Sequence, residues 1–272
     1  MNPAPAPVVV KLGGRALESA AALSELAADL ARLPGPTVLV HGGGAEVNAW
    51  CERLGITPRQ VDGLRVTDDA TLEVVVAVLA GLANKRLVAG LRHAGLDAVG
   101  LAAVDGGLIE CAPHPRASLG KVGVPRAAQL GLVRGLCETG RLPVIASIGA
   151  LDGQLVNLNA DDVAVMIAAA AGAQDLVMLS DAPGVLLEGR RVGHLDAERL
   201  AGALAHLDVS GGMRVKLHAI ARALEGGVVR VHLGAWSGPG TLLRAFSDDW
   251  DGTRITASAM PPLLAALTPG AA

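Results

Sequence analysis

The chain has 272 residues, 51% of them hydrophobic, so it can bury a sizeable core in one large or two modest domains. Its 23 lysines and arginines nearly balance its 26 aspartates and glutamates, which gives a formal net charge of −3. That charge argues against a dedicated nucleic-acid binder, which is normally basic. With one Phe and no Tyr, the core has to be built from Ala, Val and Leu.

The cysteine content and the lack of targeting signals indicate in which cellular compartment the protein works. Three cysteines, at positions 51, 111 and 137, form neither a disulfide framework nor a CxxC metal site, which fits a reducing cytosol. No uninterrupted apolar run reaches the roughly 18 residues of a membrane span. The first seven residues lack the basic-then-apolar order of a secretory signal. We therefore expect a cytoplasmic protein that binds neither membranes nor nucleic acid.

The first predicted element is a buried parallel strand at 8–12, Val-Val-Val-Lys-Leu, followed by Gly13 and Gly14. A lysine that follows three valines is costly to bury unless it meets an anion. Lys11 with two glycines behind it therefore indicates a phosphate-type loop. The alternative is a lysine that reaches water from an edge strand. A helix over 16–33 is expected next, with leucines at three- and four-residue spacing.

A second strand, at 38–41, ends in three consecutive glycines, Gly42, Gly43 and Gly44, and a helix from about Glu46 to Leu54 follows. Bare glycine N–H groups and the positive end of the helix dipole then face the same point. An anion is the natural occupant of that point. The alternative is a tight strand-to-helix turn without a ligand.

Residues 61–68 read as a turn or hairpin that leads into a long helix over 68–93. This helix is apolar on most faces, which places it centrally or in a subunit interface. Arg65 precedes it, and a guanidinium there can clamp a carboxylate through two hydrogen bonds. The alternative, slightly favoured by the residues alone, is a surface ion pair of Arg65 with Asp62 or Asp68.

An extended segment later in the chain carries Asn157 and Asn159, which face the same way because they lie two residues apart. Asn159 caps a helix that runs to Ala171, and Asp161 falls in the first turn of that helix. An acid at this place either stabilises the helix dipole or orients nearby lysines. The elements expected before this segment are a strand, a looped region with short hairpin pieces, a helix and a strand, at 97–101, 112–124, 127–139 and 142–148.

A second strand-and-helix set begins at Ala173, where we place the domain boundary. Its first strand, at 175–179, ends in a polar, glycine-containing loop at the edge where open α/β sheets bind ligands. Ser210-Gly211-Gly212 opens a third glycine-rich helix, with Lys216 in its first turns. The remaining strands are expected at 228–233 and 253–256.

These features together indicate a reaction class. Three strand-to-helix glycine loops, two lysines and an aspartate point to phosphoryl transfer, which depends mainly on positioning and charge neutralisation. No Walker A motif, protein-kinase signature or metal-ligand cluster competes with this interpretation.

Six motifs in collinear order resemble those of the acetylglutamate kinases, which belong to the amino-acid kinase family. They are Val-Lys-Leu-Gly-Gly at 10–14, Val-His-Gly-Gly-Gly at 40–44, Asp-Gly-Leu-Arg-Val-Thr at 62–67, Asn-Leu-Asn-Ala-Asp at 157–161, Leu-Ser-Asp-Ala-Pro-Gly-Val-Leu at 179–186 and Gly-Gly-Met-Arg-Val-Lys at 211–216. The resemblance implies an α/β fold, a three-layer αβα sandwich with a mainly parallel central sheet. It also implies an acetylglutamate-binding lobe at 1–172, an ATP-binding lobe at 173–260 and a frayed tail at 261–272.

The activity that the resemblance implies is ATP-dependent phosphorylation of the γ-carboxylate of N-acetyl-L-glutamate, the second step of arginine synthesis, with Mg²⁺ carried by the nucleotide. By motif, Lys11 and Lys216 neutralise the transferring phosphoryl group, Asp161 holds both lysines, and the N–H groups of Gly14 and Gly44 donate to the phosphoryl group. The acceptor would be bound by Gly43, Gly44, Arg65 and Asn157. The nucleotide site would comprise Asp181, Ala182, Pro183, Gly184, Val185, Leu186, Asp208, Val209 and Ser210.

Two other functions stay open. A sister kinase acts on carrier-linked aminoadipate, although the intact Asp-Gly-Leu-Arg-Val-Thr at 62–67 favours acetylglutamate. A non-catalytic nucleotide or amino-acid sensor on the same fold would be expected to lose a lysine or the aspartate, and here all three are present.

The expected assembly is a homodimer that arginine does not inhibit. Arginine-sensitive members of this family carry an extra N-terminal helix that links dimers into hexameric rings. Only ten residues precede Lys11, three of them prolines, and 252–255 resembles the ending of arginine-insensitive members.

Overall fold

The computed structural model of the protein describes residues 5–13 and 19–257. Its central sheet has eight strands in the order β14-β16-β15-β11-β1-β2-β8-β5. All neighbours in this sheet pair in parallel except β15 and β16, so the expected mainly parallel sheet is confirmed. The strands are β1 Val8–Leu12, β2 Thr37–His41, β5 Ala98–Ala102, β8 Leu142–Ala146, β11 Asp175–Ser180, β14 His194–Leu195, β15 Arg230–Ala235 and β16 Thr253–Thr256.

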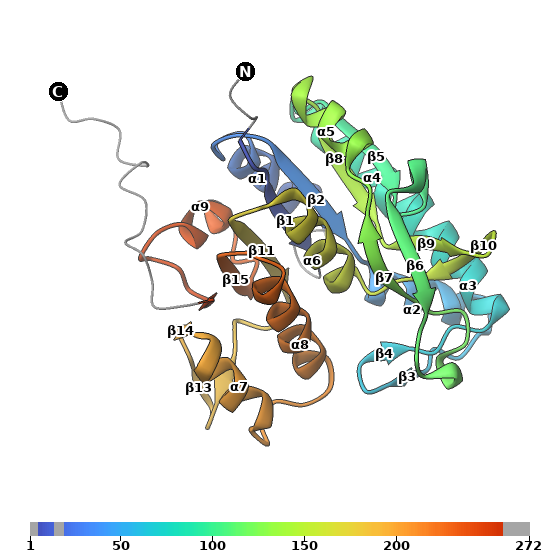
Figure 1. Cartoon of the computed structure of the whole chain (residues 1–272). Helices are drawn as coiled ribbons and strands as arrows, with labels where there is room; N and C mark the ends of the chain where they lie inside the picture. Colours follow the sequence, from blue (N-terminus) through green and yellow to red (C-terminus); the bar gives the residue numbers. More distant parts are fainter. Residues whose placement is uncertain (1–4, 14–18, 258–272) are drawn as a thin grey trace.

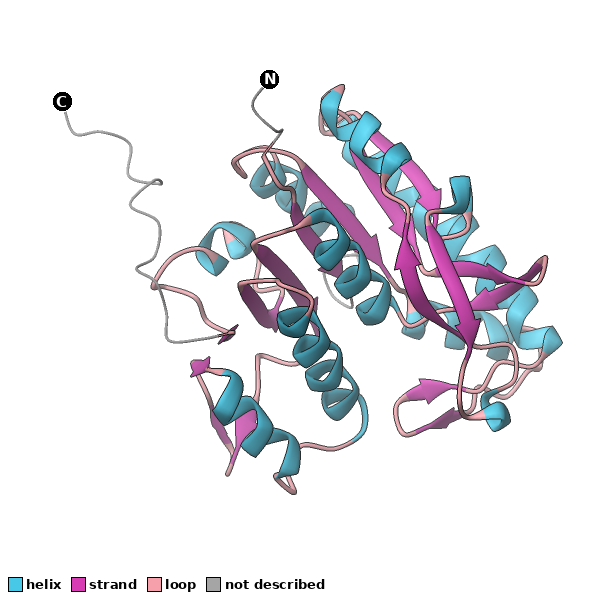
Figure 2. Cartoon of the chain, viewed as in Figure 1, coloured by secondary structure: helices cyan, strands magenta, loops and turns pink. Residues whose placement is uncertain are grey.

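Helices cover both faces of this sheet, which makes three layers (Figures 1 and 2). Successive residues of a strand point to opposite faces. Val9 accordingly packs in one core cluster with α5 Gly131–Glu138, α6 Ala160–Ala171, α7 Ala197–Ala205 and α8 Gly211–Glu225. Val10 and Leu12 pack in another cluster, with α1 Ala20–Leu30, α4 Asn84–His93 and α9 Thr241–Ala245. Lys11 therefore shares the face of Val9, toward α6 and α8.

A second, four-stranded sheet has the order β10-β9-β6-β7. Its strands are β6 Ile109–Pro113, β7 Gly123–Ala128, β9 Ile148–Leu151 and β10 Gln154–Asn157. The helix predicted over 127–139 is therefore wrong at its start. Ala127 and Ala128 pair with Glu110 and Ile109 in the β6–β7 ladder, and α5 begins only at Gly131. Pairing with a strand that lies 17 and 19 residues earlier in the chain outweighs the helix propensity of these alanines.

Shorter elements complete the described part of the chain. The hairpin predicted near 61–68 consists of β3 Gln60–Val61 and β4 Leu64–Arg65. A second hairpin consists of β12 Leu186–Leu187 and β13 Arg190–Arg191, and single 3-10 turns lie at Asp105–Gly107 and Ala117–Leu119. Because β1 pairs with β11, the central sheet runs unbroken from the predicted acetylglutamate lobe into the predicted ATP lobe.

The long apolar helix is confirmed and spans Asp69–His93 in three parts: α3 Asp69–Val76, a π-helical segment Ala77–Ala83, and α4. Contrary to the expectation from apolar runs, this helix is long and apolar enough to cross a membrane by length and composition, with a mean hydropathy of 1.7. Of the 18-residue window concerned, 44% is buried inside the protein. Core helices of water-soluble proteins meet the same criterion.

Candidate active site

A cleft of about 1750 Å³ opens at the carboxyl ends of β1, β2 and β11, the edge where open α/β sheets bind ligands. Both predicted lobes contribute to its lining. Of the residues singled out by sequence, it brings together Lys11, Gly43, Gly44, Arg65, Asn157, Asp161, Asp181, Ala182 and Lys216. Gly14 lies outside the described residues.

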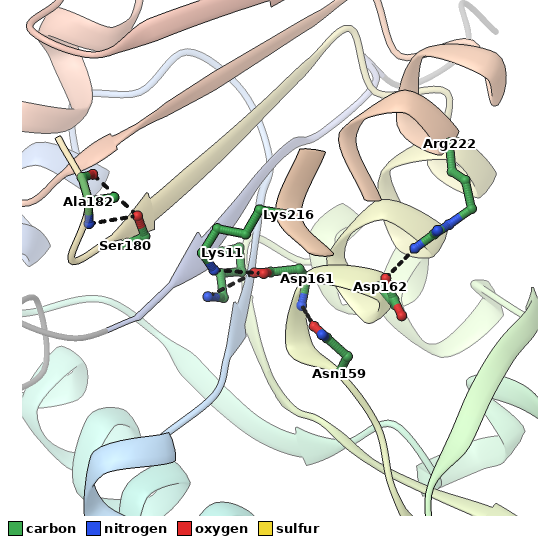
Figure 3. A network of polar contacts seen from close by, with 8 residues as sticks. All are labelled: Lys11, Asn159, Asp161, Asp162, Ser180, Ala182, Lys216 and Arg222. Atoms are coloured by element: carbon green, nitrogen blue, oxygen red, sulfur yellow. Dashed lines mark hydrogen bonds and ion pairs between the residues drawn. The ribbon is translucent and has the colours of Figure 1, made fainter. Parts of the chain in front are cut away.

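One buried carboxylate bridges two lysines in this cleft (Figure 3). Lys11 Nζ, from β1, lies 2.8 Å from Asp161 Oδ1, and Lys216 Nζ, from α8, lies 2.7 Å from Asp161 Oδ2. Asp161 occupies the first turn of α6, where the side chain of Asn159 caps the helix by accepting from Asp161 N at 2.8 Å. Lys11 does not belong to an edge strand, since β1 lies between β11 and β2. Asp161 thus contacts both lysines, as the resemblance implied.

The charges of this cluster do not cancel. Burial alone would raise the pKa of Asp161, but Lys11 and Lys216 outweigh it and hold that pKa well below its usual range. Burial lowers the pKa of Lys11, and although Asp161 opposes the shift, Lys216 adds to it. Two ammonium groups around one carboxylate leave one net positive charge in a desolvated place. Such a charge is costly unless an anion accompanies it, so the arrangement favours a bound anion.

The glycine loop after β2 is built for close approach. Gly43 is the N-cap of α2, Gly44–Arg53, which begins about two residues earlier than the sequence indicated. A Cβ on Gly43 would lie 2.7 Å from Leu79 Cδ2, so a larger residue here would have to displace the end of that leucine side chain. The first turn of α2 therefore presents bare backbone to the cleft.

Arg65 reaches the same loop. Its Nη2 donates to Gly44 O at 3.0 Å, while Nη1 is buried without a hydrogen-bond partner among the described residues. The alternative surface ion pair is not formed, because Asp62 pairs with Arg116 at 2.7 Å and Asp68 caps α3 by accepting from Thr71 N. Burial lowers the pKa of Arg65, which marks a guanidinium turned away from water and able to take a carboxylate.

Asn157 is held beside Arg65 through Thr67, a residue that the sequence analysis did not assign to the site. Asn157 Nδ2 donates to Thr67 Oγ1 at 3.1 Å, and Thr67 Oγ1 donates to Arg65 O at 3.2 Å. Thr67 is fully buried. It is the last residue of the Asp-Gly-Leu-Arg-Val-Thr motif at 62–67, so its place in that motif was the signal that could have found it.

On the predicted nucleotide side, the structure places only part of the expected set at the cleft. Ser180 Oγ accepts from Ala182 N at 3.2 Å and shapes the turn after β11 (Figure 3). The N–H of Val185 donates to Thr253 Oγ1, and Asp208 Oδ2 accepts from Glu188 N, so these groups already have partners. The cleft lining includes Ser180, Gly212 and Met213, but not Pro183, Gly184, Val185, Leu186, Asp208, Val209 or Ser210.

Comparison with known proteins identifies the family of the chain. The family model described as "Amino acid kinase family" matches residues 6–235. The chain belongs to the amino acid kinase family. Within that family it is 42% identical over 254 residues to the acetylglutamate kinase of Methanopyrus kandleri, covering 87% of this chain and 99% of the relative. It is 39% identical over 257 residues to that of Prochlorococcus marinus, covering 91% and 84%.

A solved amino acid kinase-like structure shows the same architecture. N-acetylglutamate synthase of Neisseria gonorrhoeae, complexed with coenzyme A and N-acetyl-glutamate, superposes with a TM-score of 0.81 at 26% identity. The match covers 94% of this chain and 60% of the synthase, so this chain corresponds to part of that protein. The three-layer fold implied by the motifs is therefore confirmed.

Proposed function

We propose that the chain is an acetylglutamate kinase, which transfers the γ-phosphoryl group of ATP to the γ-carboxylate of N-acetyl-L-glutamate in arginine biosynthesis. The observation that carries this proposal is the buried carboxylate of Asp161, which bridges the buried Lys11 and the partly exposed Lys216 in the cleft that the glycine loop also lines. Acetylglutamate kinases that are about 40% identical to this chain, and that it matches over most of their length, support the same reaction.

The reaction needs charge neutralisation more than proton transfer. A carboxylate oxygen of the acceptor attacks the γ-phosphorus, the bond to the bridging oxygen breaks, and ADP leaves with the electron pair. Two unit charges about 4 Å apart repel by about 4 kcal/mol at an effective dielectric near 20. Lys11 and Lys216 offset this repulsion, while Asp161 keeps them aligned. The acceptor is already ionised at neutral pH, so no general base is required.

The substrates are assigned to opposite sides of the cleft. Gly43, Gly44, Arg65 and Asn157 would hold N-acetyl-L-glutamate on the 1–172 side, and the N–H groups of Gly14 and Gly44 would donate to the phosphoryl group. ATP would lie on the 173–260 side, beside Asp181 and Ala182. Both oxygens of Asp161 contact lysines, so we assign Mg²⁺ to the nucleotide phosphates rather than to this carboxylate. Magnesium bound to the nucleotide would add to the neutralisation that the lysines provide.

The test is ADP release with N-acetyl-L-glutamate against glutamate, aspartate and N-acetylated aminoadipate. We expect N-acetyl-L-glutamate to give the highest kcat/KM. A preference for the aminoadipate compound would favour the sister kinase, and the absence of turnover with ATP binding retained would favour the sensor.

We further propose that the protein works in the cytoplasm as a homodimer that arginine does not inhibit. The helix Asp69–His93 leaves Leu82 48% exposed and Val76 and Ala80 only half-buried, which is apolar surface for a partner to cover. Light scattering should give twice the mass of one chain, with or without arginine, and millimolar arginine should leave activity unchanged. A monomer, a hexamer or inhibition by arginine would contradict this proposal.

A further inference from the structure

A buried histidine lies directly beneath the glycine loop. His41 is the last residue of β2 and is 0% exposed. Its Nδ1 lies 2.9 Å from Gly42 O, and its Nε2 lies 3.1 Å from Asn84 Nδ2. Asn84 is also 0% exposed and starts α4. The reaction described above uses neither side chain, although buried polar groups of this kind are costly unless they are satisfied.

The neighbours of Asn84 decide which ring nitrogen of His41 carries the proton. Asn84 Nδ2 lies 2.9 Å from Val144 O and 3.3 Å from Leu101 O, and Lys85 Nζ donates to Asn84 Oδ1 at 3.0 Å. These contacts fix the orientation of the amide, because its nitrogen faces acceptors and its oxygen faces a donor. The amide nitrogen has two hydrogens, and its two nearest acceptors are Val144 O and His41 Nε2. Because this nitrogen can only donate, Nε2 of His41 accepts and Nδ1 carries the hydrogen. His41 Nδ1 therefore donates to Gly42 O.

The hydrogen bond from His41 to Gly42 O fixes the orientation of the Gly42–Gly43 peptide in the glycine loop. The described residues contain no cis peptide bonds, so the carbonyl of Gly42 and the N–H of Gly43 point in opposite directions within one peptide plane. Because the ring lies buried on the carbonyl side, the Gly43 N–H is turned away from it. We propose that His41 is a positioning residue, whose Nδ1–H tautomer aims the Gly43 N–H at the bound substrate. This inference rests on the proposed function.

Two features of the surrounding fold accommodate the contact between His41 and Asn84. The π-helical segment Ala77–Ala83 ends immediately before Asn84, and its extra residue changes the direction in which α4 presents that amide. Gly100 of β5 provides the space for the Asn84 side chain, since a Cβ at position 100 would lie 2.2 Å from Asn84 Oδ1. The π-helical segment carries Leu79, whose Cδ2 lies close to Gly43. The long helix therefore contacts both His41, through Asn84, and the glycine that follows Gly42, through Leu79.

The electrostatic surroundings favour the neutral ring. Burial lowers the pKa of His41, while the hydrogen bond to Gly42 and the charge of Glu46 on α2 oppose that shift. Lys85 on α4 lowers it further. A neutral ring can keep Nε2 as an acceptor for Asn84 and Nδ1 as a donor to Gly42, whereas an imidazolium would place a second donor against the amide nitrogen.

The first test reads the tautomer in the unmodified protein. Nitrogen-15 spectra of the histidine rings, with His41 assigned by its loss in a His41→Asn variant, should show the proton on Nδ1 throughout pH 6–8. A ring protonated on Nε2, or one that becomes an imidazolium in this range, overturns the proposal. This readout does not depend on which acceptor the enzyme uses, so it stays informative if the assay with N-acetyl-L-glutamate fails.

The second test separates the two ring nitrogens by substitution. His41→Asn keeps an amide donor near the position of Nδ1. His41→Gln places its amide near the position of Nε2 and has no donor near Nδ1. We expect His41→Gln to lower kcat by roughly 10- to 100-fold, since small misplacements at a reacting centre cost about that much. The KM for ATP should change little. The kcat of His41→Asn should be at least about tenfold higher than that of His41→Gln.

The matched control is His232→Asn. His232 is equally buried but pairs with Asp175 at 2.8 Å, a residue at the opposite end of β11 from Ser180. The His232→Asn substitution should lower the melting temperature without lowering kcat. Equal kcat for the two His41 variants, or an equal loss in the control, would show that His41 only fills space. If the His41 variants fail to fold, the ring spectra of the unmodified protein decide, with the His41 ring assigned by through-bond correlation to its own backbone amide.

Discussion

Replacing Lys216 or Lys11 with alanine is expected to lower kcat by roughly 10²-fold or more, because a preorganised charge at a transferring group contributes that much. Each ammonium lies within 2.8 Å of Asp161, so either variant leaves one lysine paired with the carboxylate. The loss of one lysine turns a cluster with one net positive charge into a neutral pair, which can no longer offset the developing negative charge. Steady-state kinetics with both substrates measures the effect, and circular dichroism checks the fold.

Two further variants sharpen this result. Lys→Arg at either position should not restore full activity, because a planar guanidinium cannot occupy the place of a compact ammonium. Lys121→Ala is the matched control, since that side chain is 46% exposed and its one ion pair among the described residues is with the exposed Asp69. It should leave kcat unchanged. Near-normal turnover of Lys11→Ala or Lys216→Ala would mean that the lysine concerned is structural.

The central strands and the lysine cluster were predictable because their signals are local. Three β-branched residues before Lys11 and three glycines after His41 indicate two buried strands, and the structure has both strands. The position of Asp161 followed from Asn159, whose capping preference sets the start of α6. Collinear motifs then supplied what local patterns could not, namely that lysines 205 residues apart meet at one carboxylate.

Other parts depend on contacts between distant segments, which no local pattern encodes. The assignment of Ala127 and Ala128 to β7 depends on β6 as a partner. The contact between Asn84 and His41 joins residues 43 apart and depends on a π-helical segment that breaks the regular 3.6-residue period. An asparagine within a long apolar helix was the only visible signal. The loop at 183–186 was expected at the nucleotide, yet a buried Val185 bonded to Thr253 turns part of it inward.

Arg65→Ala is expected to raise the KM for N-acetyl-L-glutamate by roughly 10- to 150-fold, with a much smaller change in the KM for ATP. Arg65 Nη1 is buried without a partner among the described residues, so a bound carboxylate would supply the missing acceptor. A hydrogen bond to a charged group contributes about 1.5–3 kcal/mol, which corresponds to that range of affinity. Initial-rate kinetics with each substrate varied in turn measures both constants.

The matched control for this prediction is Arg59→Ala, because Arg59 precedes the same hairpin, is 64% exposed and lies 3.7 Å from Asp68 at the surface. Surface ion pairs of this kind contribute about 0–1 kcal/mol, so both KM values should stay within about fivefold of the original. Arg65→Lys should recover only part of the lost affinity, since an ammonium cannot donate to Gly44 O and bind a carboxylate through two parallel bonds. If Arg65→Ala raises both KM values equally, the guanidinium does not bind the acceptor, and the hairpin instead orders the cleft for both substrates.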